Sequence, residues 1–136
     1  MVGGARPIVS IRVHDGLPYA TVTLWYQGRS LVLPNVLVDT GSAGTVFAAD
    51  AVLAVGLQYE AHDAVYRIRG VGGSEFVFAK QIERLSLGAL QVNDFVIEVG
   101  AMDYGLDLDG ILGMDFLLQV GAVIDLATLR IHQATR

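Results

Sequence analysis

Hydrophobic and polar residues alternate along most of the chain, and this period of two predicts β-strands. Turn signals separate the strands, for example Asp15-Gly16 and Gln27-Gly28. The expected strands are Ile8–Val13, Tyr19–Tyr26, Leu31–Val38, Val65–Arg69, Glu75–Ala79, Ile82–Leu87, Leu90–Val99, Gly121–Leu126 and Leu129–His132. The pattern therefore predicts an all-β fold built mainly from hairpins, as in a barrel.

One stretch departs from this alternation. Phe47–Ala54 is rich in alanine and other good helix formers, and Gly56 suits a C-terminal cap. We expect one short helix there, backing the sheet. Met1–Arg6 contains glycines and precedes the first strand, and we expect it to be flexible.

Length and composition narrow the class of protein. The 136 residues predict a single domain spanning residues 1–136, long enough to bury a core. A net charge of −5 argues against binding to nucleic acid or to anionic membranes. No basic leader followed by an apolar stretch is present, and no apolar run approaches the ~18 residues of a membrane span.

The residue types also bear on compartment and assembly. The chain has no cysteine, which excludes disulfides and thiolate metal sites and fits a reducing compartment such as the cytoplasm. Hydrophobic residues make up 53% of the sequence, a high fraction for a small domain. This favours a buried interface between subunits.

The candidate chemistry lies where an apolar run, Val36–Val38, ends in Asp39 and is followed by Thr40-Gly41-Ser42. A carboxylate at the edge of the core is costly to ionise unless it is hydrogen-bonded. Gly41 lets the backbone come close, and the nearby amides and hydroxyls can donate to the carboxylate. The alternative is an ordinary turn, since Asp, Gly and Ser are typical turn residues.

A second apolar stretch, Asp109-Gly110-Ile111-Leu112-Gly113, again runs into glycine. Together with the segment that ends in Asp-Thr-Gly-Ser, it resembles the pattern of aspartic proteases. Only one Asp-Thr-Gly occurs in this short chain, so the resemblance is to the single-lobed retropepsin-like proteases, which work as homodimers. It covers roughly Tyr19 to Ile131.

This resemblance implies a closed, barrel-like retropepsin fold and an aspartic endopeptidase with Asp39, Thr40 and Gly41 as catalytic residues. Two carboxylates held about 3 Å apart share one proton and act together as base and acid. With one Asp39 per chain, the pair requires two chains at a two-fold axis. Thr40 would hydrogen-bond across this axis and Ser42 to the outer oxygen of Asp39. No cofactor and no metal are expected, and the partners are a peptide or protein substrate and a second copy.

The resemblance also assigns substrate-binding parts. The glycine-rich tip Gly70–Ser74 corresponds to the flap that closes over a bound peptide, and glycine there allows mobility or close approach. The acidic loop Met102–Gly110 would wall the groove, and Met114–Gln119 would form a short helix. The predicted substrate-binding residues are Ser42, Val71, Gly72, Gly73, Ser74, Asp109 and Ile111.

The chain departs from the viral members of this class. Viral enzymes pair an acid shortly after Asp-Thr-Gly with an arginine after the later glycine. Here Ala43-Gly44-Thr45 contains no acid, and Met114 follows Gly113. The sequence therefore looks more like the cellular and bacterial retropepsin-like proteases.

Several alternatives remain open at this stage. The glycine-rich tip fits an ordinary hairpin, and the same fold fits a non-catalytic peptide-binding or dimerisation module or a latent protease domain. Asp107 and Asp109 match only part of a calcium loop. Ser42 lacks the setting of a nucleophile elbow, and the glycines of the tip are not followed by a helix as in a dinucleotide site. His14, His62 and His132 are scattered and are expected at the surface.

Overall fold

The computed structural model describes residues 8–70, 73–103 and 107–134. The strands in this part of the chain are β1 (Ile8–Ser10), β2 (Arg12–His14), β3 (Leu17–Tyr26), β4 (Arg29–Val38), β5 (Val46–Ala48), β6 (Val65–Gly70), β7 (Gly73–Leu87), β8 (Leu90–Gly100), β9 (Gly110–Leu112), β10 (Ala122–Asp125) and β11 (Arg130–Gln133). The helices are α1 (Ala49–Val52), the 3₁₀ turn η1 (Leu53–Val55) and α2 (Met114–Gln119). The predicted flexible segment Met1–Arg6 lies outside the described residues.

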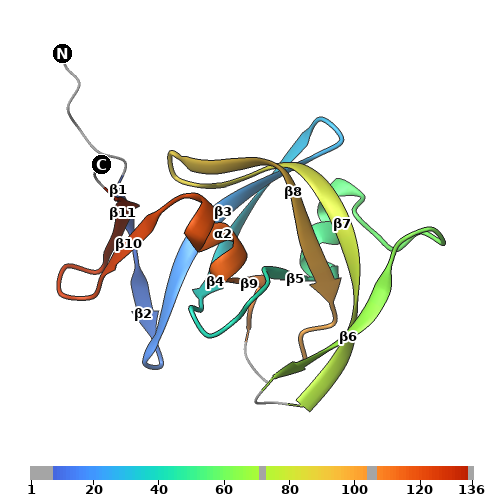
Figure 1. Cartoon of the computed structure of the whole chain (residues 1–136), viewed down its shortest axis with the longest axis horizontal. Helices are drawn as coiled ribbons and strands as arrows, with labels where there is room; N and C mark the ends of the chain where they lie inside the picture. Colours follow the sequence, from blue (N-terminus) through green and yellow to red (C-terminus); the bar gives the residue numbers. More distant parts are fainter. Residues whose placement is uncertain (1–7, 71–72, 104–106, 135–136) are drawn as a thin grey trace.

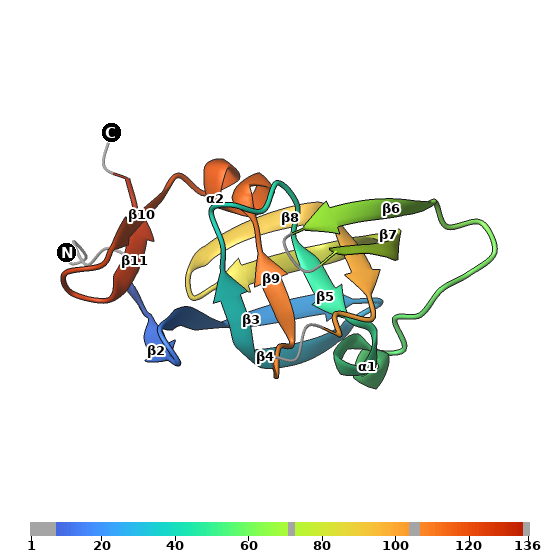
Figure 2. The same ribbon diagram turned by 90° about the horizontal axis from the view of Figure 1, so that it is seen from below.

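Most strands belong to one sheet with the order β2-β3-β4-β9-β5-β8-β7-β6. An additional pairing of β3 with β7 curls this sheet over its own core. A separate three-stranded sheet, β1-β11-β10, lies at one end of the molecule, and the β6–β7 hairpin lies toward the other end (Figures 1 and 2). The predicted all-β fold with short helices is confirmed.

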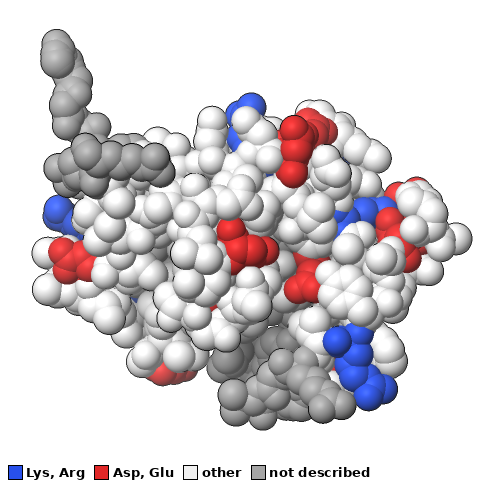
Figure 3. Space-filling view, in the orientation of Figure 1, with Lys and Arg blue, Asp and Glu red and all other residues white. Residues whose placement is uncertain are grey.

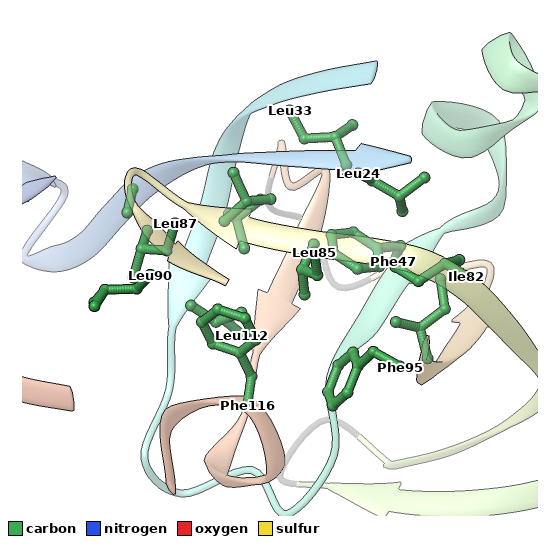
Figure 4. Packing of buried hydrophobic residues seen from close by; sticks show 14 of the residues in the cluster. Leu24, Leu33, Phe47, Ile82, Leu85, Leu87, Leu90, Phe95, Leu112 and Phe116 are labelled. Atoms are coloured by element: carbon green, nitrogen blue, oxygen red, sulfur yellow. The ribbon is translucent and has the colours of Figure 1, made fainter. Parts of the chain in front are cut away.

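The core fills the inside of the curled sheet and is closed by α2. Leu85, Phe47, Leu112 and Phe116 converge from different elements (Figure 4). Phe116 meets Phe95 edge to face, with ring centroids 6.0 Å apart. Because α2 carries Phe116 and also follows Gly113 directly, packing of this helix fixes the end of β9 as well.

A second, smaller apolar cluster lies apart from this core. Its buried members are Tyr19, Val46, Ala48, Val77, Met102 and Leu108. Ile68 of β6 and Ile111 of β9 pack against it. The cluster therefore connects the β6–β7 hairpin to the strand that follows the acidic loop.

Three predicted elements differ from the structure. The expected first strand is interrupted at Ile11, whose buried side chain joins the core between β1 and β2. The helix begins at Ala49 and not at Phe47, because Phe47 is fully buried in β5 and pairs with Val99 of β8. β7 continues without the expected break between Ala79 and Ile82, since buried Lys80 finds partners in a neighbouring loop.

Candidate active site

Asp39 directly follows β4, where the strand leaves the core. Val38 is buried and pairs with Leu112 in the parallel β4–β9 ladder, and the backbone N–H of Asp39 donates to the carbonyl of Leu112 at 3.0 Å. The Asp39 residue is half-buried, and the next residue, Thr40, is exposed. The ladder thus holds the carboxylate at the border between the core and the solvent.

The chain turns sharply after Asp39, and we name residues Asp39–Thr45 the Asp39 loop. The backbone N–H of Gly41 donates to Oδ1 of Asp39 at 2.9 Å, as expected for a carboxylate held by nearby amides. The hydroxyl of Ser42 donates to the carbonyl of Gly44 at 2.7 Å. The predicted hydrogen bond from Ser42 to the outer oxygen of Asp39 is therefore wrong, because the one hydroxyl proton is already donated within the loop.

A second carboxylate, Asp115 in the first turn of α2, holds the Asp39 loop by hydrogen bonds. Its Oδ1 accepts the hydroxyl of Thr45 at 2.7 Å, and its Oδ2 accepts the backbone N–H of the same residue at 3.2 Å. Thr45 is fully buried, and its hydroxyl oxygen accepts the N–H of Gly113 at 3.1 Å. The carboxylate therefore joins two segments that are distant in the sequence.

Gly113 brings these segments into direct contact. A Cβ atom at this position would overlap the carbonyl group of Gly44 and lie 2.9 Å from the carbonyl oxygen of Ser42. The N–H of Met114 donates to the same Ser42 carbonyl at 2.8 Å. Only glycine permits this approach of two backbones.

Asp115 is not among the predicted site residues, because the family pattern directs attention to the residue immediately after Gly113. An acid in the first turn of a helix is a recognisable signal, since the helix dipole favours it there. In this chain the acid that holds the Asp39 loop comes from α2, and its partners are the hydroxyl and amide of Thr45.

The predicted substrate-binding residues do not all lie near Asp39. Asp109 stands at the opposite end of the β4–β9 ladder, where its Oδ2 accepts the N–H of Asn35 at 2.9 Å. Ile111 pairs with Leu37 and packs in the second apolar cluster. Gly73 begins β7 opposite Gly70, and Ser74 pairs with Arg69. Val71 and Gly72 lie outside the described residues.

A pocket of about 590 Å³ opens beside the Asp39 loop. Residues from the loop, from β6, from β8 and from α2 line it: Gly41, Ser42, Ala43, Gly44, Val46, Tyr66, Ile68, Val96, Glu98 and Asp115. The hydroxyl of Tyr66 hydrogen-bonds to Glu98. Partial burial, together with this hydrogen bond to a carboxylate, raises the pKa of Tyr66 to about 12.

A separate polar group, which we name the Lys80 cluster, ties the base of the β6–β7 hairpin to the preceding loop. Lys80 Nζ lies 2.6 Å from Glu60 Oε1 and 2.7 Å from Asp63 Oδ2. The side chains of Lys80 and Asp63 are each only 6% exposed. The hydrogen bond from Lys80 is the main cause that holds the pKa of Asp63 below its ordinary value.

The ionisation of Lys80 follows from the same contacts. Burial disfavours the ammonium, but hydrogen bonds to Asp63 and Glu60 outweigh it and hold the pKa of Lys80 above its ordinary value. Lys80 is the only lysine of the sequence. In the view of Figure 3, the Lys and Arg side chains lie toward the margins of the face, and acidic side chains lie both at the margins and near the centre.

The described residues provide neither a metal site nor a membrane-spanning helix. Among them, no group of three or more His, Asp or Glu side chains could hold a metal ion. No helix in this part of the chain has the length and hydrophobicity that a membrane crossing needs. His14 and His62 are exposed and lie beside Asp15 and Asp63.

Comparisons with known proteins place the chain among relatives. The sequence profile of a family described as "Aspartyl protease" matches residues 22–116. The fold is similar to the crystal structure of a retropepsin-like aspartic protease from Rickettsia conorii, with a TM-score of 0.63 and 19% identity. That alignment covers 95% of this chain and 90% of the other. Comparison with curated protein sequences gave no match.

Proposed function

The chain belongs to the aspartyl protease family and has a retropepsin-like fold, and from this we propose that it is an aspartic endopeptidase with Asp39 as its catalytic residue. The single observation that carries the proposal is the position of Asp39. Its half-buried carboxylate follows β4 and accepts the N–H of Gly41, beside a pocket at the Asp39 loop. This arrangement suits a carboxylate that must activate water next to a bound peptide.

The reaction needs a second carboxylate, since one group must act as base and another as acid. Asp115 is the carboxylate that supports the Asp39 loop, but both of its oxygens already accept hydrogen bonds from Thr45. Because the chain carries a single Asp-Thr-Gly and its fold is similar to that of a retropepsin-like protease, we infer that the second catalytic group is Asp39 of another copy, placed opposite the first by a two-fold axis. The two carboxylates would share one proton and titrate as a pair.

In this dyad, one carboxylate takes a proton from a water molecule as the water attacks the peptide carbonyl. The other donates its proton to the carbonyl oxygen, and proton transfer to the leaving nitrogen then releases the amine. The N–H of Gly41 keeps each Asp39 carboxylate oriented during these transfers. Thr40, exposed beside Asp39, is placed to contact the partner copy.

The β6–β7 hairpin would cover the bound peptide as a flap. Tyr66 and Ile68 of β6 line the same pocket as the Asp39 loop residues Gly41–Gly44. An extended peptide between these two segments could hydrogen-bond to both backbones. Ser42, Val71, Gly72, Gly73 and Ser74 stay proposed substrate contacts, and Asp109 and Ile111 would act through the groove wall.

The three-stranded sheet is the proposed contact between the two copies. Among the described residues, no further strand pairs with its outer strands, β1 and β10, so their edges can accept a strand of a second copy. Large apolar side chains are exposed on its strands and turn: Ile8, Val123, Leu126 and Leu129. An interface with a second copy would remove these apolar side chains from water, as expected from the high hydrophobic content of the sequence.

The test is cleavage of a mixed peptide library by the purified protein, followed by mass spectrometry, with Asp39→Asn as the control. We expect cleavage at acidic pH, a decline toward alkaline pH as the shared proton is lost, and at least a ~10³-fold lower rate for the variant. Chelators should not affect the rate. Binding of peptides by both proteins without cleavage by either would contradict the proposal and favour a peptide-binding module.

A further inference from the structure

The carboxylate residue Glu98 lines the pocket beside the Asp39 loop. It lies on β8, where Phe95, Ile97 and Val99 point into the core, whereas Val96 and Glu98 line the pocket. Its backbone N–H donates to the carbonyl of Thr45 at 3.0 Å, which fixes this part of β8 against the loop. The carboxylate is therefore held at the wall of the pocket by the strand itself.

The carboxylate lies directly over Gly44. A Cβ atom at that position would lie 2.6 Å from Glu98 Oε1, so the carboxylate occupies space that the missing side chain of Gly44 leaves open. Gly44 is separated from Asp39 by only five positions in the same loop. The charge thus lies in the pocket that the residues directly after the catalytic Asp39 help to line.

The partners of Glu98 leave its charge uncompensated. The hydroxyl of Tyr66 donates to it, and with a pKa of about 12 this group remains a neutral donor. Among the described residues, no lysine, arginine or histidine forms an ion pair with Glu98. Asp115, the other acid of the pocket, is already bonded to Thr45, so Glu98 is the carboxylate that a ligand can reach.

Apolar side chains surround this charge. Val46, Ile68 and Val96 line the same pocket, and the pocket encloses about 590 Å³. Lysine and arginine combine an aliphatic stem with a charged end, which fits apolar walls around a single carboxylate. An acidic side chain would be repelled, and an aliphatic one would leave the carboxylate desolvated without a cation.

We propose that Glu98, oriented by Tyr66 and admitted by Gly44, makes this pocket a subsite for a lysine or arginine side chain of the peptide substrate. The inference rests on the proposed protease function for its role in cleavage, but it makes a separate statement about binding. Glu98 determines specificity and takes no part in the proton transfers.

The experiment uses one peptide library in which each position in turn is fixed as arginine or as norleucine, its uncharged linear counterpart. Wild-type protein cleaves the library, and immobilised Asp39→Asn protein captures it, with retained peptides identified by mass spectrometry. We expect arginine to be enriched about tenfold over norleucine at one position near the cleaved bond, equivalent to ~1.4 kcal/mol. The enrichment should shrink at high salt.

The variants separate the role of the charge from that of the shape. Glu98→Gln keeps a hydrogen-bond acceptor for Tyr66 and should abolish the arginine preference in both assays, while Glu98→Lys should shift it toward glutamate. Glu83→Gln, a carboxylate on β7 that accepts the N–H of Gly28, is the matched control and should keep the preference. Arginine enrichment that persists in Glu98→Gln, or no enrichment in either assay, would overturn the inference.

The two assays also distinguish this inference from the proposed function. If no peptide is cleaved but the Asp39→Asn protein retains arginine peptides through Glu98, the protease proposal fails and the subsite stands. If cleavage occurs with no basic preference at any position, the protease stands and the subsite fails.

Discussion

The Asp39 loop and the base of the β6–β7 hairpin are both held by carboxylates, but by different means. Asp115 supports the loop through the neutral hydroxyl and amide of Thr45, under a close contact between Gly113 and Gly44. The hairpin base depends on the ammonium of Lys80, which bridges Asp63 and Glu60. The position of the Asp39 loop is therefore fixed by close backbone contacts and neutral hydrogen-bond donors, and that of the hairpin base by ion pairs.

This difference suits the roles that we propose. A catalytic carboxylate must be placed with little freedom, and backbone contacts without spare volume achieve that. A hairpin that closes over a peptide has to move, and an ion pair at its base fixes only one end of the two strands. We expect substitutions that add volume to affect the loop, and those that remove charge to affect the hairpin.

The largest effect should come from Gly113→Ala. The added methyl group would overlap the carbonyl of Gly44, so the Asp39 loop must shift or the chain must unfold. We expect a loss of about 3 kcal/mol or more in the free energy of unfolding, at the upper end for overpacked sites, and no detectable cleavage. Urea denaturation followed by circular dichroism measures the first quantity.

Gly28→Ala is the control for this substitution. Gly28 has a positive φ of 78° but no atom near the position of a Cβ, so it tests backbone strain without a clash. It should cost only about 1 kcal/mol and leave cleavage intact. Equal losses in the two variants would show that close contact does not define the loop.

Asp115→Ala should have the next largest effect. It removes the acceptor for the buried hydroxyl of Thr45 and for its backbone N–H, and leaves both donors without their partner. We expect about 2 kcal/mol lower stability and a lower kcat, because the loop that carries Asp39 loses its support. Asp50→Ala, at an exposed position of α1, should change neither quantity appreciably.

Lys80→Met should affect the hairpin more than the loop. It removes the cation from a nearly buried carboxylate, Asp63, and should lower the melting temperature by roughly 5 °C. The KM for peptides should rise while kcat changes little, since the hairpin base loosens and Asp39 stays in place. Arg84→Met on the same strand is the control, because Arg84 bonds only to Asn93 and stacks on Trp25.

The wild-type protein offers a further readout of the hairpin base. Lys80 is its only lysine, so an amine-reactive reagent followed by peptide mapping reports the exposure of this one side chain. Slow labelling in the folded protein and faster labelling in Asp63→Asn are expected. Rapid labelling of the folded wild type would contradict a closed cluster.

The smallest effect is a change in acid stability. The pKa of Asp63 is lowered in the folded state, so its contribution is present above the ordinary aspartate value of about 3.9 and is lost as the pH falls through the lowered pKa. Asp63→Asn should therefore show a shallower loss of stability below about pH 4 than the wild type. Unfolding midpoints in urea across this range measure the difference.

The sequence was sufficient to predict most of the strands and the position of Asp39 at the end of β4, and the family resemblance implied helix α2. Hydrophobic periodicity and turn residues are local signals, so strands can be predicted from them without knowledge of the fold. The alanine-rich residues after Phe47 favour a helix and lead to the prediction that Phe47 belongs to it. In the structure, Phe47 is a strand residue because it is buried in the core and pairs with β8.

The supporting residues of the site were harder to predict. Asp115 and Thr45 lie far apart in the sequence, and they meet because β5, which follows Thr45, pairs with β9, which precedes α2. Glu98 has no local sequence signal that predicts its position over Gly44. In the sequence, Lys80 interrupts an apolar strand pattern. Its partners Glu60 and Asp63 belong to another loop, so no local signal shows that Lys80 is buried and paired within a continuous strand.

The central claim is that each active site uses Asp39 from two copies of the chain. The most direct measurement is the cleavage rate per chain as increasing amounts of Asp39→Asn protein are mixed and equilibrated with a fixed amount of wild type, with sedimentation recorded at the same concentrations. We predict a dimer whose activity falls as mixed dimers with one carboxylate form, and a rate per wild-type chain that rises with concentration and then levels off when no variant is added. A monomer that retains full activity per chain at every dilution and in every mixture would contradict the claim.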